Sequence, residues 1–154
     1  MCKVIAICNQ KGGVSKTTTT ANLGVGLVRA GKKVLVIDAD PQGNLSQSLG
    51  IENPDELEVA LPNIMEQIMT GEDVDVTKGI VHHKEGIDLM PCNIDLSAVD
   101  VSLVHVLSRE FIMKTYVDSM REFYDYILID CMPSLGVITI NSLTASDSVL
   151  IPAS

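Results

Sequence analysis

Lys11-Gly-Gly-Val-Ser-Lys-Thr-Thr-Thr-Thr20 lies between an apolar run, Val4–Cys8, and a segment with helical periodicity, Thr17–Ala30. The order of strand, glycine-rich loop, Lys-Thr and helix is typical of a phosphate-binding loop. In such a loop, consecutive backbone amides and the positive end of the following helix converge on phosphate oxygens. We therefore predict a nucleoside triphosphate as the ligand of this segment.

The residues of the loop are expected to contact different parts of the triphosphate. Gly12 and Gly13 let the backbone approach the phosphates, because they have no Cβ atom. Lys16 is expected to lie between the β- and γ-phosphates, Thr17 to place its hydroxyl on Mg²⁺, and Thr18 to reach the α-phosphate. The candidate nucleotide-binding residues are Lys11, Gly12, Gly13, Val14, Ser15, Lys16, Thr17 and Thr18.

Two positions of the loop differ from the generic pattern. Lys11 is a second lysine at the front of the loop, and from its spacing alone it could simply raise the local positive potential. Ser15 stands where glycine is expected. If that position needs a positive φ, a residue with a side chain costs about 1–2 kcal/mol there. We expect such a cost to affect hydrolysis more than binding.

Further apolar segments predict a parallel α/β sheet behind the loop. Lys33–Asp38 and Tyr126–Asp130 read as buried strands that each end on an aspartate, and Ser148–Pro152 reads as a strand broken by its proline. Ligands bind at the carboxyl edge of such a sheet. We therefore expect Asp130 to hold Mg²⁺ through water, and Asp40 to hold another metal water or to orient the attacking one.

The remaining elements are predicted from periodicity and breakers. We expect a helix near Pro62–Met69, a short strand within Gly86–Pro91 and a short helix over Gly136–Thr144. Gly24 and Gly26 interrupt the first helix, and we attribute both to close packing of the helix on the sheet. Two apolar helical faces are read as core, namely Leu96, Val99, Leu103, Val106 and Leu107, and Ile112, Met113, Tyr116, Val117 and Met120.

Composition favours a cytoplasmic, single-domain protein over residues 1–154. The chain has 154 residues, of which 46% are hydrophobic, and it contains no apolar run of the ~20 residues that a membrane helix needs. The net charge is −9, and residues 39–154 alone carry −14. Because nucleic acid repels so acidic a surface, we predict that this chain does not bind DNA appreciably.

The cysteines and the paired histidines do not predict a metal site or a disulfide framework. The four cysteines are far apart in sequence, which argues against a zinc site or a disulfide framework. Cys131 is expected to pack under the segment that follows the strand, with a redox role as the alternative. His82 and His83 are adjacent and would face opposite ways in a strand, so we read them as surface residues.

Three segments of the chain form a recognisable set: Asn9-Gln-Lys-Gly-Gly-Val-Ser-Lys-Thr-Thr-Thr19, Asp38-Ala-Asp-Pro-Gln-Gly-Asn44 and Tyr124-Asp-Tyr-Ile-Leu-Ile-Asp-Cys-Met-Pro-Ser-Leu-Gly136. Together they resemble the nucleotide-site motifs of the ParA/Soj family of chromosome- and plasmid-partitioning ATPases. The resemblance continues through Thr139–Pro152 and covers nearly the whole chain. It implies a three-layer α/β/α P-loop NTPase fold with a mostly parallel, twisted sheet, and ATP and Mg²⁺ as cofactors.

The resemblance is to the deviant Walker A (MinD/ParA) class, and it also implies roles for three candidate catalytic residues. In the ATP-bound homodimer of that class, Lys11 would reach the phosphates of the partner subunit and Lys16 would act within its own subunit. Asp40 would position or activate water. The resemblance further implies that a full-length protein binds non-specific DNA on the nucleoid and a ParB-like centromere-binding partner, without membrane contact.

The chain departs from this family in three ways. Ser15 replaces the loop glycine, Met132 replaces a proline after the Walker B strand, and family chains continue well past residue 154. We therefore expect a domain that lacks the C-terminal part of the family fold. The alternatives are a nucleotide-binding module without significant turnover and a MinD-like positioning ATPase. ATP rather than GTP rests on the resemblance alone.

Overall fold

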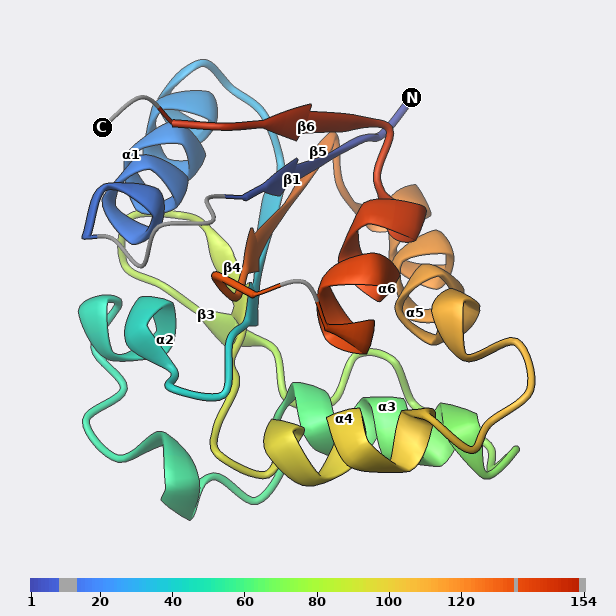
Figure 1. The fold of residues 1–154 in the computed structure, drawn as a ribbon. Coiled ribbons are helices and arrows are strands. Elements are labelled where there is room, and N and C mark those ends of the chain that lie inside the picture. The colour runs from blue at the N-terminus through green and yellow to red at the C-terminus, as the bar shows by residue number, and fades with distance from the viewer. Residues whose placement is uncertain (9–13, 135, 153–154) are drawn as a thin grey trace.

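A six-stranded sheet forms the centre of the computed structural model, which describes residues 1–8, 14–134 and 136–152 (Figure 1). The strand order is β3-β4-β2-β5-β1-β6, and all pairings are parallel except that between β3 and β4. The strands are β1 (Lys3–Ile7), β2 (Val34–Ala39), β3 (Val81–His82), β4 (Asp88–Met90), β5 (Tyr126–Cys131) and β6 (Ser148–Leu150). This arrangement confirms the predicted α/β fold with a mostly parallel sheet.

Helices cover both faces of the sheet and make three layers. The helices α1 (Val14–Arg29) and α2 (Asn44–Ser48) lie on one face, and the remaining α-helices lie on the other (Figure 1). Those are α3 (Leu61–Met69), α4 (Leu96–Leu103), α5 (Ile112–Met120) and α6 (Val137–Ala145). The described residues also form three short 3₁₀ turns: η1 (Pro54–Glu56) before α3, η2 (Arg109–Phe111) before α5 and η3 (Arg121–Phe123) after α5.

The central strands β2 and β5 are buried because helices cover both of their faces, and their neighbour β1 is buried except at Lys3 and Ile5. Every residue of β2 is buried, and so is all of β5 except the half-buried Tyr126. This burial explains why both strands read as continuous apolar runs rather than as alternating patterns. The parallel register pairs Asp130 with Ile7 on β1 and with Asp38 on β2, so the carboxyl ends of all three strands meet at one edge.

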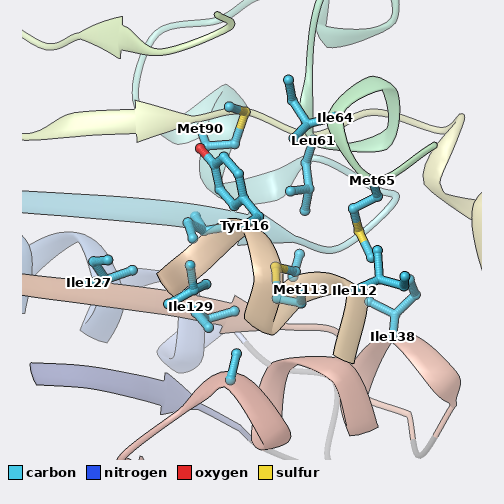
Figure 2. Close-up of a cluster of buried hydrophobic side chains, with 14 of the residues drawn as sticks. Leu61, Ile64, Met65, Met90, Ile112, Met113, Tyr116, Ile127, Ile129 and Ile138 are labelled. Carbon is cyan, nitrogen blue, oxygen red and sulfur yellow. The ribbon is translucent and has the colours of Figure 1, made fainter. Parts of the chain in front are cut away.

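The larger core lies between the sheet and helices α3 to α6. Figure 2 shows Tyr116 of α5 among Leu61, Ile64 and Met90, with the strand residue Ile129 beneath the helix. All five apolar residues predicted for α5 are buried, which confirms that helical face as core. The hydroxyl of Tyr116 is also buried and has no hydrogen-bond partner among the described residues.

Two sequence predictions about packing are wrong. Leu107 was predicted to lie in the core but is 94% exposed, because α4 ends at Leu103 and Leu107 is no longer part of its apolar face. Gly26 has no atom within 4 Å of where a Cβ would lie, whereas a Cβ on Gly24 would lie 3.3 Å from Val36 Cγ1. Residues two apart on a helix face nearly opposite directions, so only Gly24 packs on the sheet.

One edge of the described sheet is formed by β6. This strand pairs only with β1, and Val149 and Leu150 are largely exposed. The opposite edge is the two-residue strand β3, which the sequence did not predict. Among the described residues, no helix has the length and apolar character needed to cross a membrane.

Candidate nucleotide-binding site

A pocket of about 790 Å³ opens at the carboxyl edge of the sheet, where the sequence predicts the ligand. Three chain segments form most of its wall: the start of α1, the turn after β2 and the segment after β5. The lining residues are Lys16, Thr17, Thr18, Asp40, Pro41, Gln42, Asn44, Ser48, Ser97, Met132, Pro133 and Ser134. The structure thus brings together Lys16, Thr17, Thr18 and Asp40 as the sequence predicts.

Asp130 lies beneath this pocket at the centre of a buried polar network. Its Oδ1 atom is 2.6 Å from the Lys16 ammonium, and its Oδ2 atom accepts a hydrogen bond of 3.3 Å from the Thr17 hydroxyl. The hydroxyl of Thr20 donates to Oδ1 at 3.2 Å. Lys16 is 3% exposed and Asp130 fully buried, so solvent screens this ion pair little.

The protonation of Asp130 is set by two opposing effects. Burial raises the pKa of its carboxyl, while the Lys16 ammonium and the threonine hydroxyls lower it, with burial the larger effect. Breaking the pair by removing Lys16 would leave a buried carboxylate without a cation, a change that costs about 3–5 kcal/mol in proteins. Lys16 therefore has a structural role in addition to its predicted contact with phosphate.

Asp40 lies one residue beyond β2 and is 7% exposed. Its Oδ1 atom accepts a hydrogen bond of 3.0 Å from the backbone N–H of Gln42, which holds the carboxylate at the wall of the pocket. Asp40 thus has the access to the pocket that its predicted role with water requires.

Asp38 is a buried carboxylate at this edge of the sheet for which the sequence predicts no separate role. It is fully buried, and its Oδ2 atom accepts hydrogen bonds from the Ser46 hydroxyl at 2.7 Å and the Ser46 N–H at 3.0 Å. Burial raises the pKa of Asp38 to about 7, although these hydrogen bonds lower it. The Ser46 hydroxyl also accepts from the Cys92 N–H at 3.0 Å. Asp38 therefore anchors α2, whose residues Asn44 and Ser48 line the pocket.

Hydrogen bonds link the segment after β5 to α6, and the start of α6 to α4. Met132, Pro133 and Ser134 line the pocket, and the Thr139 hydroxyl donates to the Ser134 carbonyl. The N–H of Ile138 near the start of α6 donates to the Asp100 carboxylate at 3.3 Å. Met132, which departs from the family pattern, is half-buried against the core on the α6 face.

Part of the predicted loop lies outside the described residues. Lys11, Gly12 and Gly13 belong to that part, so their predicted roles remain predictions. Val14 and Ser15 form the beginning of α1. Because helical backbone has a negative φ, the condition under which Ser15 would be strained does not hold.

The donor atoms at the pocket suit a magnesium ion. Mg²⁺ prefers oxygen ligands and retains several waters, and Thr17, Asp40 and Asp130 offer a hydroxyl and two carboxylates. Of these, Thr17 and Asp40 line the pocket, and Asp130 lies behind Thr17 and accepts a hydrogen bond from its hydroxyl. No group of three or more histidine, cysteine or acidic residues is placed to hold a metal ion in the described ranges. His82 is exposed and interacts with Asp88 instead.

Comparison with known proteins defines the class. The family model described as AAA domain matches residues 2–154, so the chain belongs to this family. It is 47% identical over 152 residues to the sporulation initiation inhibitor protein Soj of Bacillus subtilis, covering 99% of this chain and 58% of that protein. It is 41% identical over 152 residues to the chromosome partitioning protein ParA of Caulobacter vibrioides, covering 97% and 55%. The ParA/Soj resemblance is thereby confirmed.

Solved structures agree with this assignment. The fold matches cobyrinic acid a,c-diamide synthase from Mycobacterium smegmatis with bound ADP and magnesium at a TM-score of 0.92 and 41% identity, covering 99% of this chain and 60% of that one. A plasmid partition protein from Borrelia burgdorferi matches at 0.81 and 31%, covering 98% and 64%. These matches confirm the P-loop NTPase fold. The chain spans little more than half the length of these relatives.

Proposed function

We propose that this chain is an ATP-binding and ATP-hydrolysing switch of the ParA/Soj type that uses Mg²⁺. The observation that supports this most is the network of Lys16, Thr17 and Asp130 at the base of a pocket that also exposes Asp40. It combines a cation and a hydroxyl for a triphosphate with a carboxylate positioned to act on water. The ADP and magnesium in the M. smegmatis structure further support the choice of cofactors.

The residues of the chain take the following roles in this proposal. Lys16 contacts the β- and γ-phosphates, and Thr17 holds Mg²⁺ directly while Asp130 holds it through water. The bound ion supplies charge neutralisation for the transferred phosphoryl group. Asp40 accepts a hydrogen bond from the attacking water and orients it. Lys16 must share its ammonium between Asp130 and a phosphate, since the pair is only 2.6 Å apart.

Dimerisation and partner binding form the outer part of the proposal. Lys11 reaches the phosphates of a second copy in the ATP-bound homodimer, as in the deviant Walker A class that the sequence resembles. We propose that the full-length protein acts in chromosome or plasmid partitioning, which the names chromosome partitioning protein ParA and plasmid partition protein of two relatives support. Non-specific DNA and a ParB-like partner are proposed from the sequence resemblance. The present chain carries a net charge of −9 and is proposed not to bind DNA by itself.

The test is ATP binding measured by calorimetry together with steady-state hydrolysis in Mg²⁺. Asp40→Asn is the informative variant, because asparagine keeps an acceptor for the Gln42 N–H and removes only the charge. We expect binding within about threefold of the original and turnover reduced roughly 10²-fold, as for loss of a general base. Asp75→Asn is the matched control, since Asp75 is exposed and lies outside the pocket.

The experiment separates this function from a binding module without turnover. Equal hydrolysis by the original and Asp40→Asn would remove the proposed catalytic role of Asp40. ATP binding without measurable hydrolysis by the original would favour the binding module. Light scattering of Asp40→Asn with ATP, compared with Lys11→Ala, tests the dimer; a monomer in both would exclude the role of Lys11 across the interface.

A further inference from the structure

Two cysteines that are remote in sequence meet at the carboxyl ends of β1 and β5, in the core on the α3–α6 face of the sheet. Cys8 follows β1 and Cys131 ends β5, and their Sγ atoms are 3.0 Å apart. The register pairs Ile7 with Asp130, so Cys8 and Cys131 are the next residues along two neighbouring parallel strands. Neighbouring strands are about 4.8 Å apart, which lies within the Cα separation that a disulfide accepts. A bond of about 2.0 Å therefore requires the sulfurs to approach by only about 1 Å.

The two thiols differ in their access to solvent. Cys131 is fully buried against the α6 side of the core, whereas Cys8 is only half-buried. All four cysteines are free and lie in the described part of the chain. The Sγ atoms of Cys2 and Cys92 instead hydrogen-bond backbone carbonyls, those of Lys3 and Asn93. Cys8 and Cys131 are therefore the pair placed to react with each other.

We propose that Cys8 and Cys131 are a reversible disulfide site, with Cys8 the thiol that meets the oxidant and Cys131 the thiol that resolves it. The oxidant is a low-molecular-weight disulfide. The Cys8 sulfur, losing its proton, attacks one sulfur of that molecule and forms a mixed disulfide, and the other half leaves as a thiol. Cys131, losing its proton, then attacks Cys8 Sγ and releases the second thiol. Two protein thiols lose two electrons and two protons, and the small disulfide gains them.

The crosslink would join the chain immediately before the predicted phosphate-binding loop to the chain immediately before a segment that lines the pocket. Cys8 directly precedes residues 9–13, and Cys131 directly precedes the pocket-lining Met132. An effect of oxidation on ATP turnover would rest on the proposed function. Formation of the disulfide does not depend on the proposed function. A count of free thiols therefore tests the disulfide separately from any effect on ATP turnover.

The purified protein is treated with oxidised glutathione, and its thiols are titrated in denaturant. We expect the count to fall from four to two and to return to four with dithiothreitol. Mass spectrometry of the non-reduced digest should find the peptide of Cys8 joined to that of Cys131. The variant Cys131→Ser should trap one glutathione on Cys8, because the resolving thiol is missing, and Cys8→Ser should keep its three thiols.

The matched control is Cys92→Ser, which should still lose two thiols under the same treatment. An unchanged count in the original protein overturns the proposal. So does a loss of thiols that persists in Cys8→Ser, or a crosslinked peptide that contains Cys2 or Cys92. The peptide analysis uses the unmutated protein, so it decides the question even if a serine variant fails to fold.

Discussion

Ser46→Ala should destabilise the fold by an amount that depends on pH. The Ser46 hydroxyl makes two buried contacts: it donates to Asp38 Oδ2 at 2.7 Å and accepts from the Cys92 N–H at 3.0 Å. All three residues are fully buried, so water cannot replace either contact without rearrangement. Ser46 does not line the nucleotide pocket, and the effect is therefore one on stability rather than on ligand contacts.

The magnitude follows from these two contacts. A hydrogen bond to a charged group contributes about 1.5–3 kcal/mol, and a buried N–H left without a partner costs about 1–3 kcal/mol. At pH 8.5 we therefore expect a loss of roughly 3–5 kcal/mol. At pH 5.5 Asp38 is protonated in the fold, because its pKa is raised to about 7. The lost bond is then a neutral one of about 1 kcal/mol, and the total falls by roughly 1 kcal/mol.

The sign of the pH dependence comes from proton binding in the two states. The pKa of Asp38 is about 7 in the fold and 3.8 as its ordinary value, so between about pH 4 and pH 7 the folded state holds the proton that the unfolded state has lost. The contribution of Asp38 to the free energy of unfolding therefore decreases as pH rises through this window and is constant above it. In Ser46→Ala, the decrease should extend to higher pH, since the lost hydrogen bond had lowered the pKa of Asp38.

The assay is urea denaturation at pH 5.5 and pH 8.5, with unchanged m-values as evidence that both proteins unfold alike. Ser48→Ala is the matched control, because Ser48 lies in the same helix and its hydroxyl bonds only the Leu45 carbonyl at 2.9 Å. It should cost less than about 1 kcal/mol at both pH values. A Ser46→Ala loss no larger than that of Ser48→Ala, or one equal at both pH values, would refute the reasoning.

Three further experiments test the packing and the ion pair. In a double-mutant cycle of Lys16→Met and Asp130→Asn, each single change should lower the free energy of unfolding by about 3–5 kcal/mol. The double change should lower it by at least about 1 kcal/mol less than the sum of the two single changes. Additive losses would contradict the buried ion pair. Gly86→Ala should lower the free energy of unfolding by roughly 2 kcal/mol or more, because φ at this position is +96° and the new Cβ would lie 2.7 Å from a valine methyl. Gly26→Ala lies on an open helix face and should instead raise it by up to about 1 kcal/mol. Tyr116→Phe should raise the free energy of unfolding by about 1 kcal/mol, because it removes a buried hydroxyl without a partner, and a loss would show that the hydroxyl is hydrogen-bonded. Urea denaturation measures all of these.

The parts of the fold that the sequence predicts are those with a strong local pattern. β2 and β5 are uninterrupted apolar runs, and α5 has a complete helical stripe, so each was assigned nearly to its bounds. The helix α2 was not predicted, because its five residues have no apolar periodicity and its position depends on hydrogen bonds from Ser46 to Asp38. The strand β3 has only two residues and forms by pairing with β4, an interaction that no local pattern indicates.

At the candidate site, too, the sequence predicts where the acidic residues lie but not how their environments differ. Asp38, Asp40 and Asp130 look alike in the sequence, since each stands at or just beyond the end of a buried strand. Their chemistry differs because of what the fold places against them: two groups of Ser46 against Asp38, the Lys16 ammonium against Asp130, and the open pocket against Asp40. Asp38 and Asp130 are paired by register on neighbouring strands, and two adjacent buried carboxylates disfavour each other's charge. Burial is the main reason why the pKa of Asp38 rises to about 7 despite three hydrogen bonds from donors, and the nearby Asp130 carboxylate raises it further. Asp130, by contrast, lies against the Lys16 ammonium. Asp40 lines the pocket, and its carboxylate accepts a hydrogen bond from the Gln42 N–H rather than from a buried side chain in the described residues. This difference supports our proposal that Asp40 is the acid of the three that acts on a ligand in the pocket.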